Sequence, residues 1–349
     1  MHPTARRLAV LAVPALAAAG ALLPAPREAA ATVTETAGRA AAAPRPAVHE
    51  AAGTATEQRT VKKFWTVARM KAAKPLIASG TGDRHFAVGG FPLNAPAPTT
   101  PGPSAGTAST AARASSRTSG SSWTAGGTVT KTTGRVFFTV AKGSEAGRNA
   151  SCSGTAVTSA NKSVVFTAGH CVKLNGAFHA NWVFVPGYDR GDRPDGTWPA
   201  ITLLTTPQWN SSEDMNYDIA AAVVAPQDGK SLTDVVGGQG VVFNQPRGRQ
   251  TYAFGYPAGA PYDGSKLVYC SGRTFDDHLG SRAQGLSCGM TGGSSGGPWF
   301  VGFDERTGSG LLNSVNSFKY NFASYWMFGP YFGPEAEAVY NTAQKTPLT

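Results

Sequence analysis

A glycine-rich stretch near the C-terminal end, Met290–Trp299 (MTGGSSGGPW), holds the residues best suited to nucleophilic chemistry. Four glycines and a proline surround Ser294 and Ser295 there. Because glycine adopts backbone angles that are costly for other residues, such a run can form a tight turn that points a serine hydroxyl outward, beside backbone N–H groups. Acyl transfer needs this geometry of a nucleophile beside an oxyanion hole. The alternative is a Gly/Ser-rich surface loop.

A second stretch, Phe166–Cys171 (FTAGHC), places His170 where an apolar, strand-like run ends at a glycine. A general base must be held rigidly, and a disulfide at the next residue, Cys171, would hold this one. The alternative is a surface or hydrogen-bonded core histidine. We take His170 as the candidate base, and we expect His179 and His278, which stand in polar, turn-like surroundings, to be surface residues.

An imidazole base of this kind needs a buried carboxylate that fixes its tautomer. Asp218 lies in Asn216–Val224 (NYDIAAAVV), directly before an apolar strand-like run. An acid at the entrance of a buried strand is costly unless a partner satisfies it, and an imidazole N–H would do so. The competitor is Asp214, whose neighbours are typical of an exposed turn. We favour Asp218.

The order of these residues along the chain separates the classes of serine hydrolase. The sequence GSSGG at 293–297 formally matches the nucleophile elbow of the α/β-hydrolases, but that fold needs its histidine after the serine, and none follows Ser295. The subtilisin order needs an aspartate before the histidine, and only Asp83, in a presumed pro-segment, precedes His170. What remains is His170, Asp218, Ser295, the order of chymotrypsin.

The blocks TAGHC, YDIA and GGSSGGP resemble the catalytic blocks of secreted bacterial chymotrypsin-like serine peptidases, over roughly residues 130–330. The resemblance implies an all-β fold of two six-stranded antiparallel β-barrels with the triad in the cleft between them. It implies that Ser295, directly before Gly-Gly-Pro, is the nucleophile. It also implies an oxyanion hole made by the N–H groups of Gly293 and Ser295. No metal or cofactor is required.

The chain departs from this family at its specificity and activation positions. Many members carry an aspartate where Ser294 stands, and it receives the new N-terminal amine on activation. Members specific for basic residues carry an aspartate where Gly289 stands, and glutamate-specific relatives use a histidine after the nucleophile, where this chain has none. Ser314, Val315 and Asn316 are candidates for the pocket wall and for contacts with the substrate backbone. We expect a neutral or apolar P1 side chain.

The four cysteines favour disulfides in an exported chain, although the sequence alone allows three connectivities. Pairing of neighbours, Cys152–Cys171 and Cys270–Cys288, would close two loops of about twenty residues, each contributing on the order of 3 kcal/mol. A metal site is the alternative, but no zinc-type cysteine and histidine spacing occurs. The family resemblance supports Cys152–Cys171, because such a disulfide recurs beside the family's histidine.

The net charge of +10 is concentrated in the N-terminal third of the chain. Residues 1–120 hold 14 Lys and Arg against 5 Asp and Glu, whereas residues 121–349 hold 17 against 16. The nearly neutral C-terminal part argues against a nucleic-acid-binding surface there. We therefore expect no nucleic acid. The resemblance to peptidases implies a protein or peptide substrate, and we expect a monomer.

The N-terminal third has the composition of export and processing segments. Arg6 and Arg7 precede an apolar run at 8–23 and then small residues, which predicts a signal peptide over residues 1–30. A membrane anchor is the alternative, but the run is short and interrupted. Residues 31–120 are interpreted as a pro-segment and a Pro/Ser-rich linker, with one amphipathic helix over residues 58–77. The alternative for this basic helix is that it lies on a membrane. We expect a secreted, extracellular protein without membrane contact after export.

Residues 121–349 are predicted to form the peptidase domain, because short β-like runs separated by Gly, Pro, Asn and Asp dominate there. A C-terminal helix is predicted from Pro334 to Gln344, since Pro334 begins it and acids fill its first turn. Two alternatives to a peptidase stay open: an inactive or binding-only homologue on the same fold, and an esterase that uses the same triad. The runs are 134–140, 154–158, 163–167, 181–185, 201–204, 219–224, 241–243, 251–256, 267–269, 299–302 and 311–318.

Overall fold

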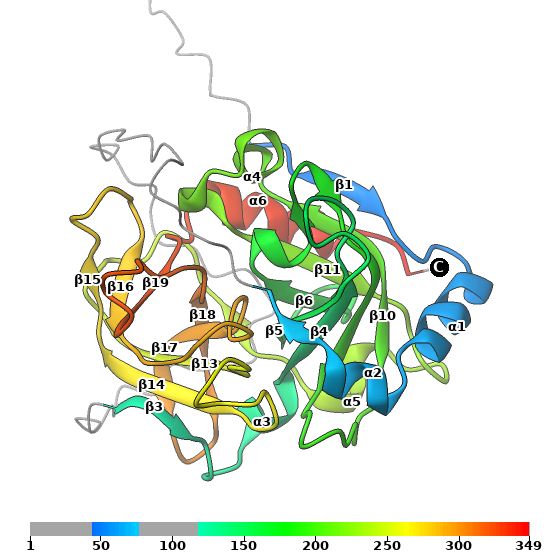
Figure 1. Ribbon diagram of the computed structural model, residues 1–349, viewed down its shortest axis with the longest axis horizontal. Coiled ribbons are helices and arrows are strands. Elements are labelled where there is room, and N and C mark those ends of the chain that lie inside the picture. Colours follow the sequence, from blue (N-terminus) through cyan, green and yellow to red (C-terminus); the bar gives the residue numbers. More distant parts are fainter. Residues whose placement is uncertain (1–43, 77–117, 349) are drawn as a thin grey trace, which may run out of the picture. The chain divides into compact units, whose positions relative to one another are not determined.

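The computed structural model describes residues 44–76 and 118–348 (Figure 1). The predicted signal peptide and most of the predicted linker lie outside the described residues. Each of the eleven predicted β-like runs overlaps a strand, so the all-β prediction is confirmed. In the described parts of the chain, no helix has the length and apolarity needed to cross a membrane.

The first half of the peptidase domain forms a closed antiparallel barrel, as expected. Neighbouring strands pair in the order β9-β4-β5-β6-β11-β10, and a further pairing between β10 and β9 closes the ring. Large side chains such as Phe137, Phe166 and Phe184 are fully buried, and their burial stabilises the barrel. The strands are β4 (Thr133–Thr139), β5 (Asn149–Val157), β6 (Val164–Thr167), β9 (Ala180–Pro186), β10 (Trp198–Thr205) and β11 (Ala220–Val224).

The second half is an open sheet, so the expectation of a second six-stranded barrel is not met by the described strands. Six strands pair in the order β12-β18-β17-β13-β14-β3, and β15-β16-β19 form a separate sheet. Beyond β18, the backbone groups of Asn316 bond Gly296 and Gly297 just before β17, and an isolated bridge joins Phe318 to Phe328 of β19. The strands are β3 (Thr118–Ser122), β12 (Gly240–Val241), β13 (Gln250–Gly255), β14 (Val268–Arg273), β15 (Phe275–Asp276), β16 (Gln284–Ser287), β17 (Pro298–Asp304), β18 (Ser309–Val315) and β19 (Trp326–Gly329).

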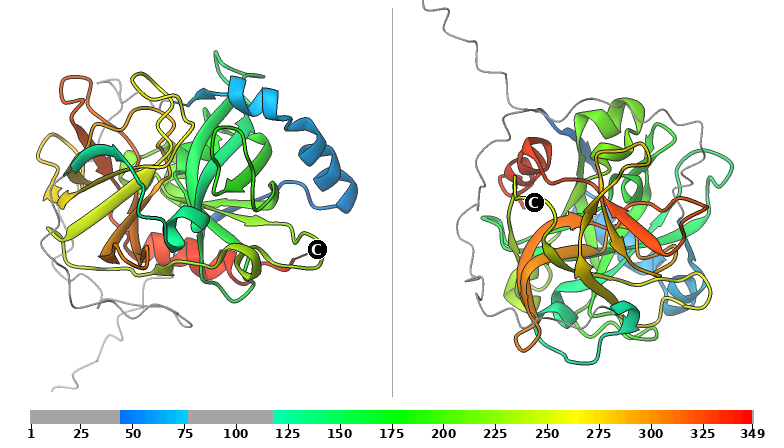
Figure 2. Two further views of the ribbon diagram at one scale, coloured as in Figure 1. Left: turned by 90° about the horizontal axis from the view of Figure 1, so that it is seen from below. Right: turned by 90° about the vertical axis from the view of Figure 1, so that its left-hand side faces the viewer.

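The C-terminal helix is confirmed as α6 (Pro334–Ala343), with Pro334 in its first turn and Glu335 and Glu337 following. It buries Val339 and Tyr340 and lies against β11 of the barrel (Figure 2). The remaining short elements of this part are α3 (Thr128–Thr132), α4 (Pro207–Ser212), α5 (Leu232–Val236), β7 (Lys173–Leu174) and β8 (Ala177–Phe178).

Residues 44–76 pack on the barrel rather than standing apart from it. The single helix predicted at 58–77 is wrong: α1 (Ala55–Phe64) and α2 (Val67–Ala72) are separate helices. The break occurs because the Thr66 hydroxyl caps α2, while the buried Trp65 donates to a barrel carbonyl from its Nε1. On either side, β1 (Ala47–Glu50) pairs with β10 and β2 (Lys74–Pro75) pairs with β5 (Figure 1).

Candidate active site

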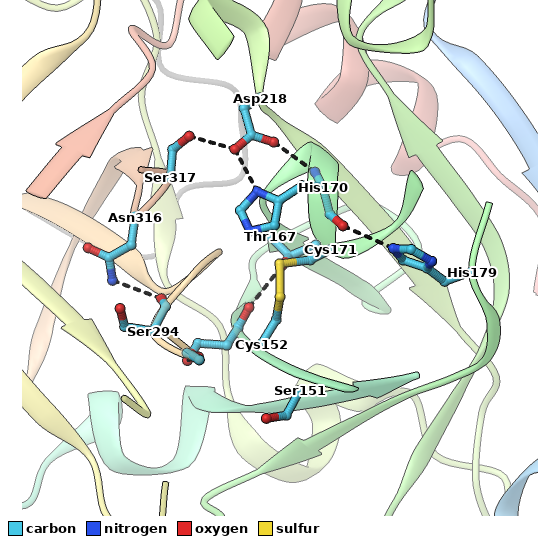
Figure 3. The surroundings of a disulfide bond; sticks show 12 residues. Ser151, Cys152, Thr167, His170, Cys171, His179, Asp218, Ser294, Asn316 and Ser317 are labelled. Carbon is cyan, nitrogen blue, oxygen red and sulfur yellow. Dashed lines mark hydrogen bonds and ion pairs between the residues drawn. A yellow bond between two sulfur atoms is a disulfide. The ribbon is translucent and has the colours of Figure 1, made fainter. Parts of the chain in front are cut away.

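His170 and Asp218 form a buried hydrogen-bonded pair in the first barrel (Figure 3). His170 lies in a one-turn 3₁₀ segment directly after β6, and Asp218 lies just before β11. Because β6 and β11 pair antiparallel, with Thr167 opposite Ala220, the end of one strand meets the beginning of the other. The Nδ1–H of His170 donates to Asp218 Oδ2 at 2.8 Å, and the His170 backbone N–H donates to Oδ1 at 2.7 Å. The structure thus brings Asp218 to His170 and leaves both side chains without exposed surface.

Two residues that the sequence does not single out hold the pair in place. The Ser317 hydroxyl donates to Asp218 Oδ2 at 2.5 Å. His179, expected at the surface, is 2% exposed, stacks on Phe138 and donates from Nε2 to the His170 carbonyl at 3.0 Å. Burial lowers the pKa of His179 to about 4, so the ring is neutral near pH 7. The surface prediction for His179 is therefore wrong, because apolar stacking and one hydrogen bond offset its desolvation, whereas His278 is exposed as expected.

Both predicted disulfides are present, Cys152–Cys171 and Cys270–Cys288. The first ties β5 to the residue that follows His170. Although the two sulfurs of this bond lie near the His170 ring, they are joined to each other and are not thiolate ligands for a metal.

The glycine-rich stretch forms a tight turn between the two sheets. Gly293 and Gly296 have φ of +95° and +77°, in the region that favours glycine. At Gly296 a Cβ would lie 2.1 Å from Thr167 Oγ1, so an alanine has no room there. Ser153, next to the disulfide, donates its N–H to the Ser295 carbonyl at 2.7 Å and its hydroxyl to the Gly293 carbonyl at 2.8 Å. The turn is therefore attached to the strand that leads to the disulfide beside His170.

The two serines of the turn have different surroundings. The Ser294 hydroxyl donates to the Thr291 carbonyl at 2.8 Å. Ser295 is 7% exposed, and its hydroxyl bonds no group in the part of the chain that the structure describes. Nε2 of His170 is buried and has no hydrogen-bond partner within residues 44–76 and 118–348. Among the described residues, the N–H groups of Gly293 and Ser295 also bond no protein acceptor.

Asn316 is buried under the turn. Its Nδ2 donates to the carbonyls of Phe254 and Ser294 at 2.7 and 3.0 Å, and its Oδ1 accepts from Trp299 Nε1 at 2.7 Å (Figure 3). With its backbone N–H and carbonyl bonded to Gly297 and Gly296, Asn316 supports the turn and has no group left for a substrate backbone.

The other expected substrate contacts lie around this support. Ser314 and Val315 are paired with β17, and the Ser314 hydroxyl donates to the Pro330 carbonyl at 2.7 Å. Gly289 donates its N–H to the Ser119 carbonyl of β3 at 2.6 Å. Next to it, the Lys319 amine donates to the Cys288 carbonyl at 2.7 Å, and burial lowers the pKa of this amine to about 8. The Lys319 cation thus lies beside Gly289, the position where peptidases specific for basic residues carry an aspartate.

The supporting residues Ser317 and His179 leave little signal in the sequence. Ser317 stands at the end of a predicted β-like run, and His179 stands in polar, turn-like surroundings. The fold brings Ser317 to Asp218 from the segment after β18, and the short β7–β8 hairpin brings His179 back to the His170 carbonyl.

No protein-family model and no curated protein matches the chain. Solved structures do match: the protease Anisep from Arthrobacter nicotinovorans is 44% identical, with a TM-score of 0.59, over 65% of this chain and 100% of Anisep. A thermostable serine protease, AL20, from an extremophilic microorganism is 43% identical, with a TM-score of 0.59, over 63% of this chain and 100% of AL20. Since this chain spans the whole of two serine proteases at these identities, it belongs to the chymotrypsin-like serine peptidases, as a serine-type endopeptidase.

Proposed function

We propose that the chain hydrolyses peptide bonds by covalent acyl transfer, with Ser295 as the nucleophile. The observation that carries this proposal is the Nε2 of the buried His170, which bonds none of the described residues while the opposite nitrogen is held by Asp218. A tautomer with its proton on Nδ1 leaves Nε2 as an acceptor, and a serine hydroxyl in the adjoining turn is the group that it can activate.

The reaction would proceed in two halves on these residues. Ser295 Oγ attacks the substrate carbonyl while His170 Nε2 takes its proton, and the oxyanion forms against the N–H groups of Gly293 and Ser295. His170 then protonates the leaving amine. In the second half, His170 takes a proton from water as the water attacks the acyl group, and it returns that proton to Ser295 Oγ as the acid product leaves. Asp218 stabilises the imidazolium through the Nδ1 hydrogen bond.

The experiment compares Ser295→Ala with Ser294→Ala in the secreted protein. Ser295→Ala should remove nearly all turnover and all labelling by a fluorophosphonate, since loss of the nucleophile costs about 10⁶-fold in kcat. Ser294→Ala loses one hydrogen bond to Thr291 and should keep labelling. Labelling of the Ser295 variant would overturn the assignment. Parallel peptide and ester substrates separate a peptidase from an esterase.

For the P1 residue, a neutral or apolar side chain fits best. Gly289 supplies no acid, and the Lys319 amine beside the Cys288 carbonyl disfavours a basic side chain. Turnover of matched peptides that differ only at P1 tests this preference.

We also propose that the protein is exported and matured by cleavage between residues 76 and 118, and that the mature enzyme is a monomer. Two contacts support this interval: β2 and the residues before it pack on the barrel as an added layer, whereas β3 is a strand of the second sheet. A cut at the predicted boundary near residue 120 would divide β3, so the mature chain should begin before Thr118. N-terminal sequencing and gel filtration of active enzyme check these points.

A further inference from the structure

A basic cavity of about 700 Å³ lies outside the catalytic pair. It is lined by Arg135 of β4, by the loop that holds Tyr188 and Arg190, and by the loop that holds Asp263 and Lys266. Lys71 of α2 also lines it, but Lys71 belongs to the segment that we propose is removed on maturation. The mature enzyme keeps three cationic side chains and one acid there, and Arg190 already has a partner in Asp189 at 3.5 Å.

Arg135 is the unusual member of this group. It is 2% exposed, its Nη2 donates to Ser151 Oγ at 2.7 Å, and its buried Nε has no hydrogen-bond partner among the described residues. The guanidinium lies over the rings of Phe137 and Tyr188, at 4.6 and 5.0 Å from their centres. Within the described part of the chain, no carboxylate lies within ion-pair distance of it, and burial lowers its pKa. Tyr188 and the Asp263 carboxylate of the same cavity raise the pKa of Arg135 and offset part of this effect, but Asp263 lies outside ion-pair distance. A ligand carboxylate in direct contact with the guanidinium would therefore gain a stronger interaction.

One loop connects the cavity to the turn at residues 290–299 that carries Ser295. Ala258 and Gly259 donate their N–H groups to the Gly292 carbonyl at 2.7 and 3.3 Å, so the start of this loop is attached to the turn. Its other end, at Gly264, approaches Arg135, because a Cβ at Gly264 would lie 3.0 Å from the guanidinium carbon.

The second connection is through the disulfide. Ser151, the hydrogen-bond partner of Arg135, precedes Cys152, whose sulfur is bonded to the residue after His170. His170 is the group that protonates the leaving amine in the proposed reaction. The cavity is therefore connected both to the turn that carries Ser295 and to the segment that carries His170.

We infer that this cavity is a carboxylate-binding subsite that favours substrates with an acidic side chain shortly after the scissile bond. Arg135 supplies a planar pair of donors, and Lys266 and Arg190 at the rim supply attraction over a longer range. This inference rests on the proposed function, because it takes the substrate to be a peptide that Ser295 cleaves.

The test uses the active enzyme and pairs of peptides that are identical up to the scissile bond. One of each pair carries Glu and the other Gln at the first, second or third position after that bond. At the best position kcat/KM for the Glu peptide should exceed that for the Gln peptide about tenfold, the worth of a hydrogen bond to a charged group. The ratio should fall towards one in Arg135→Gln and in Lys266→Glu, and salt should reduce it. Lys230→Glu, an exposed charge reversal outside this cavity, should keep it.

Each outcome of this test supports or contradicts either the subsite or the proposed function. Lys266 is exposed, so its variant tests the subsite even if Arg135→Gln does not fold. If the wild-type ratio is one at all three positions, the subsite does not exist. If wild type cleaves neither peptide, or if Ser295→Ala still cleaves the Gln peptide, it is the proposed function that fails.

Discussion

The His170–Asp218 pair and the turn that carries Ser295, the proposed nucleophile, are held in place by different kinds of contact. His170 and Asp218 lie in a closed barrel, and side-chain hydrogen bonds from Ser317 and a disulfide at the next residue fix them. The turn that carries Ser295 leads into β17 of the second sheet, and backbone carbonyls bonded to Asn316 and Ser153 fix it. The base is therefore sensitive to the loss of single side-chain partners, whereas the nucleophile depends on the conformation of a whole turn.

Asp218→Asn should give the largest effect on the base side of this comparison. An amide offers one acceptor oxygen where the carboxylate offers two, so the His170 tautomer is no longer fixed. We expect kcat to fall about 10⁴-fold, whereas the unfolding free energy should fall by no more than about 2 kcal/mol. Pre-steady-state acylation with an ester substrate measures the loss.

Ser317→Ala is the matched variant for this prediction. It removes one donor to Asp218 and leaves both bonds to His170, so we expect a loss of about tenfold or less. Equal losses in the two variants would mean that Asp218 does not act through the His170 ring.

Asn316→Ala should give the larger effect on the nucleophile side. It leaves the carbonyls of Phe254 and Ser294 and the Trp299 Nε1–H buried without their partner. We expect about 3 kcal/mol less unfolding free energy, together with a lower rate of fluorophosphonate labelling. Urea unfolding of the variant, made together with Ser295→Ala to prevent self-cleavage, measures the first quantity.

Asn313→Ala is the control, because Asn313 is also buried but its Oδ1 has no hydrogen-bond partner among the described residues. Asn313→Ala should lower the unfolding free energy clearly less than Asn316→Ala does. If both variants lower it equally, the turn does not depend on the hydrogen bonds of Asn316.

The catalytic motifs can be predicted because their chemistry is written in short local blocks. A glycine-terminated strand indicates His170 and an acid before an apolar run indicates Asp218, and the structure brings the two together. The support cannot be predicted in this way, because Ser317 and Asn316 contact partners that are far away in the sequence. The second closed barrel is implied by resemblance alone, and the described strands do not show it.

The burial of His179, which the sequence does not indicate, should have the smallest effect of these, a pH dependence of the unfolding free energy. Its pKa of about 4 in the folded protein lies below its ordinary value of 6.5, so the unfolded chain binds more protons between these values. Stability contributed by the neutral ring is therefore complete above pH 6.5 and is lost as the pH falls towards 4.

His179→Gln keeps a donor for the His170 carbonyl but does not titrate, so it should remove this dependence. Both proteins are made in the Ser295→Ala background, and their unfolding free energies are measured in urea at several pH values. Lowering the pH from about 6.5 to about 5.5 should cost the protein with His179 about 1 kcal/mol more than the His179→Gln variant. Parallel curves for the two proteins over this range would show that His179 is not held neutral by burial.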